Sequence, residues 1–151
     1  MWALATALIE GKATPCLRVH GKLHPLRRAG PGAAALPASI ADILADWPSN
    51  EAKLEALART LAAEEGLEAE LLAPVLYPGK VLCAGANYYD HMAEMGFPGV
   101  KKETQRLFFF MKPPRNAVVG PGATVKKPRA TKKLDWEIEL AAVIGSALRL
   151  R

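Results

Sequence analysis

The sequence predicts an α+β protein with a small N-terminal α/β domain, residues 1–77, and a strand-rich part, residues 78–151. Two observations in the chain carry this prediction. Apolar residues recur at helical spacing between residues 40 and 61, whereas short apolar runs bounded by Gly and Pro dominate the C-terminal part. The stretch 71–78 between them holds two prolines that disfavour a helix, so we expect an extended linker there.

Composition narrows the class of protein. The chain has 151 residues, half of them apolar and 23% charged, which suits a folded protein of one ordinary domain or two small ones. Its net charge of +5 allows an acidic partner, either nucleic acid or a small polyanionic substrate. No apolar run approaches the roughly 20 residues that cross a bilayer, and the first ten residues lack the basic flank of a signal peptide. Two cysteines outside any CxxC pair exclude a disulfide scaffold and a zinc knuckle. We therefore expect a cytoplasmic protein without a membrane partner.

The first elements predicted are strands. Residues 2–9 are β-prone in part, and residues 15–20 and 23–24 flank a tight Gly-Lys turn. His20 and His24 border this turn with no partner nearby in the sequence, so both are expected on the surface.

Two helices follow a loop in residues 28–37, which are rich in Gly, Pro and Ala. Ser39 precedes the first helix, which Pro48 is expected to end. The second begins near Ser49 or Asn50 and ends at Gly66. Their apolar residues at helical spacing are Ile40, Ile43, Leu44 and Trp47, and then Leu54, Leu57 and Leu61.

The C-terminal part predicts three strands. Residues 81–84 and 107–111 are short apolar runs closed by Gly or Pro, and residues 120–122 form a Gly-Pro-Gly turn. Residues 134–144 are the longest strand candidate.

Two acidic residues interrupt that last strand. In a strand Glu137 and Glu139 would point to the same face about 7 Å apart, where their charges repel unless a cation lies between them. Carboxylates suit Mg²⁺, Mn²⁺ or Ca²⁺. Spacing alone favours the alternative, a solvated acidic face paired with Lys132 and Lys133.

A second pair follows the strand 81–84. His91 and Glu94 are three residues apart, so one helical turn would place them side by side and let the carboxylate orient the imidazole as a general base. Taken alone, such a pair is more often an ordinary feature of a helix surface.

Basic residues give two further candidates. Lys112 stands between an apolar run and two prolines, where its ammonium could reach a substrate carboxylate or simply be solvated. Residues 126–133 hold a basic cluster that could contact phosphates. Aromatic residues are absent from this cluster, which favours a solvated loop.

Taken together, four motifs resemble the fumarylacetoacetate hydrolase family. They are PGKVLCAGANYYDHMAEMG at residues 78–96, FFMKP at 109–113, VGPG at 119–122 and LDWEIELAAVIG at 134–145, and the resembling segment runs to about residue 148. Four motifs in the expected order are more specific than any one. The chain is most similar to bacterial acylpyruvate hydrolases and 2-hydroxyhepta-2,4-diene-1,7-dioate isomerases of that family, in their N-terminal portion. The resemblance implies that residues 78–151 begin the mixed β-roll of a catalytic domain.

The resemblance also implies roles for the candidate residues. Glu137 and Glu139 would be metal ligands for Mg²⁺ or Mn²⁺, with Ca²⁺ possible, and His91 oriented by Glu94 would activate water. Lys112 would bind substrate. The implied reaction is hydrolysis of a C–C bond in an acylpyruvate-like 2,4-dioxo acid, a small anionic 2-oxo acid of aromatic catabolism, through a metal-stabilised enolate.

Several alternatives stay open. Within the family, an isomerase or decarboxylase of a 2-oxo-ene-dioate would use the same enolate without an attacking water. Outside it, residues 126–133 would serve a nucleic-acid-binding module, or the chain would be a non-catalytic relative kept for assembly. Family members are homodimers as a rule and bring a third metal-ligating Asp and a catalytic Lys after the last motif, so we expect a homodimer and a chain truncated at Arg151.

Overall fold

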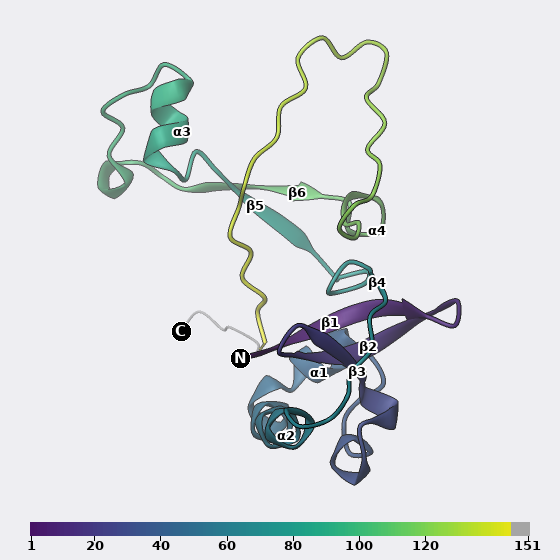
Figure 1. Ribbon diagram of the computed structural model, residues 1–151. Helices are drawn as coiled ribbons and strands as arrows, with labels where there is room; N and C mark the ends of the chain where they lie inside the picture. The colour runs from purple at the N-terminus through teal and green to yellow at the C-terminus, as the bar shows by residue number, and fades with distance from the viewer. Residues whose placement is uncertain (146–151) are drawn as a thin grey trace. The chain divides into compact units, whose positions relative to one another are not determined.

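The computed structural model describes residues 1–145 and has a mixed α/β fold with antiparallel sheets (Figure 1). It contains two compact units, one formed by residues 1–76 with residues 119–145 and the other by Tyr77–Val118. The predicted domains, 1–77 and 78–151, stay a prediction. No helix among the described residues is both long and apolar enough to cross a membrane.

The first unit is built on a four-stranded antiparallel sheet of order β3-β2-β1-β4 (Figure 1). Two-residue turns join the first three strands, and each has two residues with positive φ: 51° and 73° at Glu10 and Gly11, 49° and 86° at His20 and Gly21. This geometry is typical of type I′ hairpins, whose twist matches that of the strands. The three predicted strands are confirmed as β1, Trp2–Ile9, β2, Lys12–Val19, and β3, Lys22–Pro25, and the last two are longer than expected. The short fourth strand, β4 at Glu70–Leu71, was not predicted.

Two helices cover one face of this sheet: α1, Ile40–Ala45, and α2, Trp47–Leu61 (Figure 1). The predicted cap is confirmed, because Ser39 Oγ accepts a hydrogen bond from the Asp42 N–H at 3.1 Å. Pro48 lies in the first turn of α2, where a missing N–H costs nothing, so it opens the second helix rather than ending the first.

Alternation along the strands produces two cores. Leu17 and Val19 of β2 face the helices and pack with Leu54, Leu57 and Leu61. Cys16 faces the other side, where it packs with Ala5, Ala7 and Leu23 beneath residues 67–71. Two short 3₁₀ turns, η1 (Leu26–Arg28) and η2 (Pro31–Ala33), lead from β3 to the helices.

The second unit contains the antiparallel pair β5, Val81–Gly85, and β6, Phe108–Lys112. Both strands were predicted to within a residue or two. Three helical segments accompany the pair: α3 at Tyr89–Glu94, the 3₁₀ turn η3 at Lys102–Thr104 and α4 at Pro114–Ala117.

The predicted strand at residues 134–144 is wrong in this structure. These residues have no regular secondary structure, and Trp136, Ile138 and Leu140 are exposed. A strand exists only where its backbone pairs with a neighbour, whereas an alternating sequence gives only the propensity. The antiparallel pair β5–β6 gives a sheet where the β-roll was expected, but the roll itself stays a prediction. The end of the resembling segment, residues 146–148, lies outside the described residues.

Candidate active site

The loop and helix that carry His91 have sharply defined ends. Ala86, directly after β5, adopts a φ of 54°, which turns the chain out of the strand. At the other end Gly96 has a φ of 88°, and the Phe97 N–H donates to the Met92 carbonyl at 2.9 Å. This is the Schellman arrangement that ends a helix on a glycine, so α3 is held to two turns between β5 and a fixed C-terminus.

Within α3 the structure brings His91 and Glu94 together as predicted. His91 Nδ1 lies 3.8 Å from Glu94 Oε2, with the two side chains 38% and 81% exposed. This is an ion-pair distance rather than a hydrogen bond, and in enzymes without substrate such contacts are often longer than in the reactive complex. Asp90 Oδ1 accepts the His91 N–H at 2.9 Å. The arrangement can hold an imidazole beside a carboxylate, which suits a general base.

A contact missed in the sequence ties the following loop to α3. The ammonium of Lys102 stands 4.6 Å from the ring centroid of Tyr89, and Tyr89 Oη donates to Glu103 Oε1 at 3.5 Å. The ammonium is attracted by the negative face of the ring. No periodicity or motif relates positions 89 and 102, so only the fold could reveal this contact.

Lys112 lies in the same unit, at the far end of the β5–β6 pair from α3. It pairs with Val81 at the start of β5, whereas α3 follows Gly85 at its end. Four residues along a strand separate these ends by about 13 Å. Lys112 is exposed, and a role in binding substrate stays a prediction.

Glu137 and Glu139 lie in the other unit, among exposed residues without regular secondary structure. No group of three or more His, Cys, Asp or Glu side chains that could hold a metal occurs within residues 1–145. The two carboxylates have the oxygen donors that Mg²⁺ and Mn²⁺ prefer, but two are fewer than a hard cation normally takes from its ligands. Their role as metal ligands stays a prediction.

The basic cluster at residues 126–133 is an exposed loop apart from one half-buried residue. Lys127 Nζ donates to the carbonyl of Thr131, which closes the loop on itself. The interpretation as a solvated loop and the nucleic-acid alternative are both compatible with this geometry.

The structure buries two side chains whose burial the sequence did not predict. His24 is only 6% exposed, although it was expected on the surface, because α2 and residues 66–67 cover β3. The thiol of Cys16 is also buried, which raises its pKa to about 11. A thiol that stays protonated at neutral pH is a poor nucleophile, so Cys16 has no place in the candidate site.

Comparison with known proteins places the four motifs in one family. The family model "Fumarylacetoacetate (FAA) hydrolase C-terminal" matches residues 80–150. No solved structure matches the chain.

Named relatives extend the match into the N-terminal part. Human "Oxaloacetate tautomerase FAHD2B, mitochondrial" is 41% identical over 99 residues, which cover 63% of this chain and 30% of the relative. Bovine "Oxaloacetate tautomerase FAHD2A, mitochondrial" is 39% identical over 114 residues, or 73% of this chain and 34% of the relative. "Uncharacterized protein PH0643" of Pyrococcus horikoshii is 37% identical over 68 residues, or 45% and 27%. The chain thus spans about a third of the length of the curated relatives it matches.

Proposed function

Because the chain belongs to the fumarylacetoacetate hydrolase family over residues 80–150, we propose that the protein is an enzyme that moves a proton at the carbon next to the carbonyl of a 2-oxo acid. The observation that carries this proposal is the contact between His91 and Glu94 on α3, at 3.8 Å. An imidazole is the common general base near neutral pH, because its ordinary pKa lies there.

The chemistry follows from what each side chain can do. His91 takes the proton from the carbon beside the carbonyl, and the imidazolium then returns it to the enolate oxygen, so that the keto form becomes the enol with no net change in protons. Glu94 keeps the ring oriented and stabilises its transient positive charge. General acid–base catalysis of this kind contributes about 10²- to 10⁴-fold to a rate.

Glu137 and Glu139 would hold a divalent cation, Mg²⁺ or Mn²⁺ by the oxygen chemistry of the pair. When bound, such an ion polarises a carbonyl oxygen and stabilises negative charge on it. In this proposal the carboxylates of the two residues serve only to bind the ion, while His91 transfers the proton.

The names of the relatives favour a tautomerase of a 2-oxo dicarboxylic acid such as oxaloacetate. A small anionic 2-oxo acid also suits the net charge of +5. The second candidate is the hydrolase predicted from the motifs, in which His91 removes a proton from water for attack on the distal carbonyl of a 2,4-dioxo acid. Both candidates need His91, which is the group that the structure holds against a carboxylate.

One experiment distinguishes the tautomerase from the hydrolase. The purified protein is given oxaloacetate and, separately, acetylpyruvate, with Mg²⁺ or Mn²⁺, and loss of the enol absorbance is followed. A tautomerase speeds the approach of oxaloacetate to keto–enol equilibrium and forms no new product. A hydrolase converts acetylpyruvate to two acids and leaves the oxaloacetate rate unchanged. No effect on either substrate would contradict the proposal.

A further inference from the structure

A large hollow lies in the first unit, lined by residues between positions 23 and 67. It has a volume of about 1000 Å³ and runs between β3 with the turns that follow it and one face of α2. Leu57 and Leu61 line it from the helix, and Leu67 lines it from the segment after the helix. This volume and this mainly apolar lining are typical of sites for organic ligands of moderate size. We call this hollow the α2 groove.

A buried imidazole stands in the wall of the α2 groove. His24 is 6% exposed, and its imidazole makes no hydrogen bond within the described residues 1–145. No buried side-chain nitrogen or oxygen lacks a partner among the described residues, so the ring nitrogens must still reach the solvent of the groove. An imidazole so placed can accept one hydrogen bond and donate another to a ligand.

Gly66 packs directly against this imidazole. A Cβ added at Gly66 would stand 2.8 Å from His24 Nε2 and 2.6 Å from Lys22 Cβ. Any other side chain at position 66 would therefore push against the ring. A glycine at position 66 is therefore what allows the chain to pass this close to His24.

The charges along the groove have opposite signs at its two ends. Lys53 lies in the N-terminal half of α2, and Glu64 and Glu65 follow its C-terminus. Lys53 and Leu61 are separated by about 12 Å along the helix axis, and Glu64 follows three residues after the helix ends. Arg28 on the opposite wall pairs with Glu10 at 3.0 Å, so Lys53 supplies the positive charge of the groove. The groove thus has a positive end, an apolar middle with a polar imidazole, and a negative end.

We propose that the α2 groove binds a short extended peptide with free termini and apolar side chains. The amino terminus would lie at Glu64 and Glu65, and the carboxylate at Lys53. At about 3.3 Å per residue, four or five residues span the distance between these charges. The exposed Ala56 of the helix and the half-buried Leu67 would contact the apolar side chains, while His24 would hydrogen-bond to the peptide backbone. The proposal is independent of the reaction assigned to His91.

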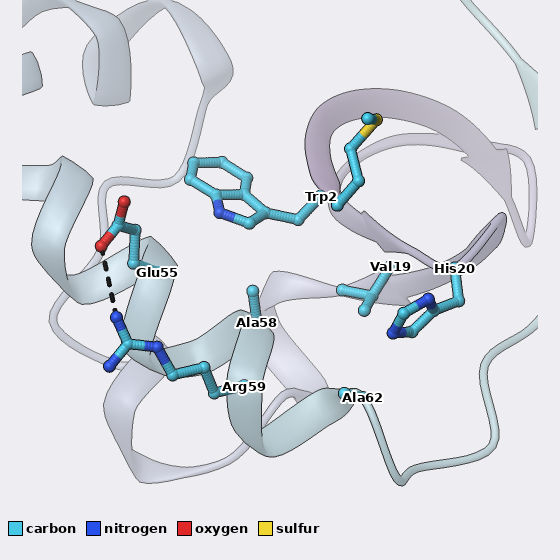
Figure 2. A pocket seen from close by; sticks show the side chains of 8 residues that line it. Trp2, Val19, His20, Glu55, Ala58, Arg59 and Ala62 are labelled. Carbon is cyan, nitrogen blue, oxygen red and sulfur yellow. Dashed lines mark ion pairs between the residues drawn. The ribbon is translucent and has the colours of Figure 1, made fainter.

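The hollow on the other side of α2 lacks these properties. It has a volume of about 280 Å³, and its charged groups, Glu55 and Arg59, pair with each other at 3.5 Å (Figure 2). Trp2 and His20 line the same hollow (Figure 2). Because its charges are already neutralised, it offers matched positions for control substitutions.

Binding is tested by NMR on the isotope-labelled chain with the peptide Ala-Leu-Ala-Leu-Ala and with the same peptide acetylated and amidated at its ends. We expect the free peptide to shift the amide signals of Leu57, Leu61 and Gly66. Capping removes both terminal charges and should weaken binding about tenfold, since each exposed ion pair contributes only modestly. Both peptides act on the unaltered protein, so this comparison does not depend on the folding of a variant.

Variants of the protein then identify the residues that bind the peptide. Glu64→Gln and Lys53→Gln should each weaken binding of the free peptide several-fold without changing the affinity for the capped peptide. Glu55→Gln should change neither affinity. His24→Gln should weaken both, with His20→Asn as its control. Equal affinity for the two peptides would mean a merely apolar hollow and would overturn the proposal. So would signal changes confined to other surfaces, or no binding at millimolar peptide.

Discussion

The ring of Phe108 covers Gly85 so closely that a Cβ at Gly85 would stand 2.1 Å from Phe108 Cζ. The two residues face each other across the β5–β6 pair, at the end from which the chain turns towards His91. An aromatic ring lying over a strand glycine compensates for the missing side chain. A methyl group at position 85 would displace the ring.

This contact predicts that substitutions at the two positions have strongly coupled effects on the free energy of unfolding. Gly85→Ala should lower the free energy of unfolding by about 1 kcal/mol in the original chain, because the ring loses its place. In a Phe108→Ala background the same substitution should cost nothing, since no ring remains to be displaced. Urea unfolding of the two single variants and the double variant measures the coupling. Additive effects would contradict the contact.

Asn50 predicts a second effect on stability. Its side chain is 3% exposed, and Nδ2 donates to the carbonyl of Ile43 at 3.0 Å, which joins α2 to α1. Asn50→Ala should cost about 1–3 kcal/mol of unfolding free energy, because it leaves a buried carbonyl without its donor. Asn116→Ala on exposed α4 is the control and should change stability by less than about 0.5 kcal/mol. Equal effects in thermal unfolding would show that the buried bond contributes nothing.

The burial of Cys16 predicts that the stability of the fold depends on pH in the alkaline range. Its pKa rises from the ordinary value of 9.0 to about 11 in the folded protein. Between these values the unfolded chain releases the proton while the folded chain keeps it, so the free energy of unfolding falls as pH rises from about 9 to 11. Urea midpoints at pH 8 and pH 10.5 should therefore differ more in the original chain than in Cys16→Ala. An identical difference in both would exclude this thiol as the cause.

The proposed metal site predicts a change in metal affinity that can be measured without substrate. Glu137→Gln and Glu139→Gln should each weaken Mn²⁺ binding measured by calorimetry at least tenfold, because a neutral amide is a poorer ligand than a carboxylate. Glu103→Gln, which changes an acidic residue of η3 in the other unit, should leave the affinity unchanged. Retained Mn²⁺ binding in the double variant Glu137→Gln with Glu139→Gln would contradict the assignment.

Local signals in the sequence predicted most of the first unit. Ser39 is a capping residue whose preference acts within one turn, and the spacing of Leu54, Leu57 and Leu61 places them on one helix face, so both helices were found. The end of α2 was predicted at Gly66, but the helix stops at Leu61. Gly66 instead lies against His24, a tertiary contact that capping preferences do not contain.

Long-range pairing explains the failures. Residues 134–144 alternate like a strand, but whether they form one depends on a partner that local sequence does not specify. His24 was expected at the surface because no partner lies near it in the sequence, whereas its burial comes from α2 and Leu67. The pair His91 and Glu94 was found because three residues make nearly one helical turn, which is a local rule.

The most direct test of the proposed function is the rate of oxaloacetate keto–enol interconversion in His91→Gln compared with the original chain. His20→Asn, which changes an exposed histidine of the other unit, is the control. Loss of the proton-transfer group should lower kcat by about 10²- to 10⁴-fold while the control keeps its full rate. A His91→Gln variant that turns over oxaloacetate as fast as the original chain would show that His91 is not the group that moves the proton.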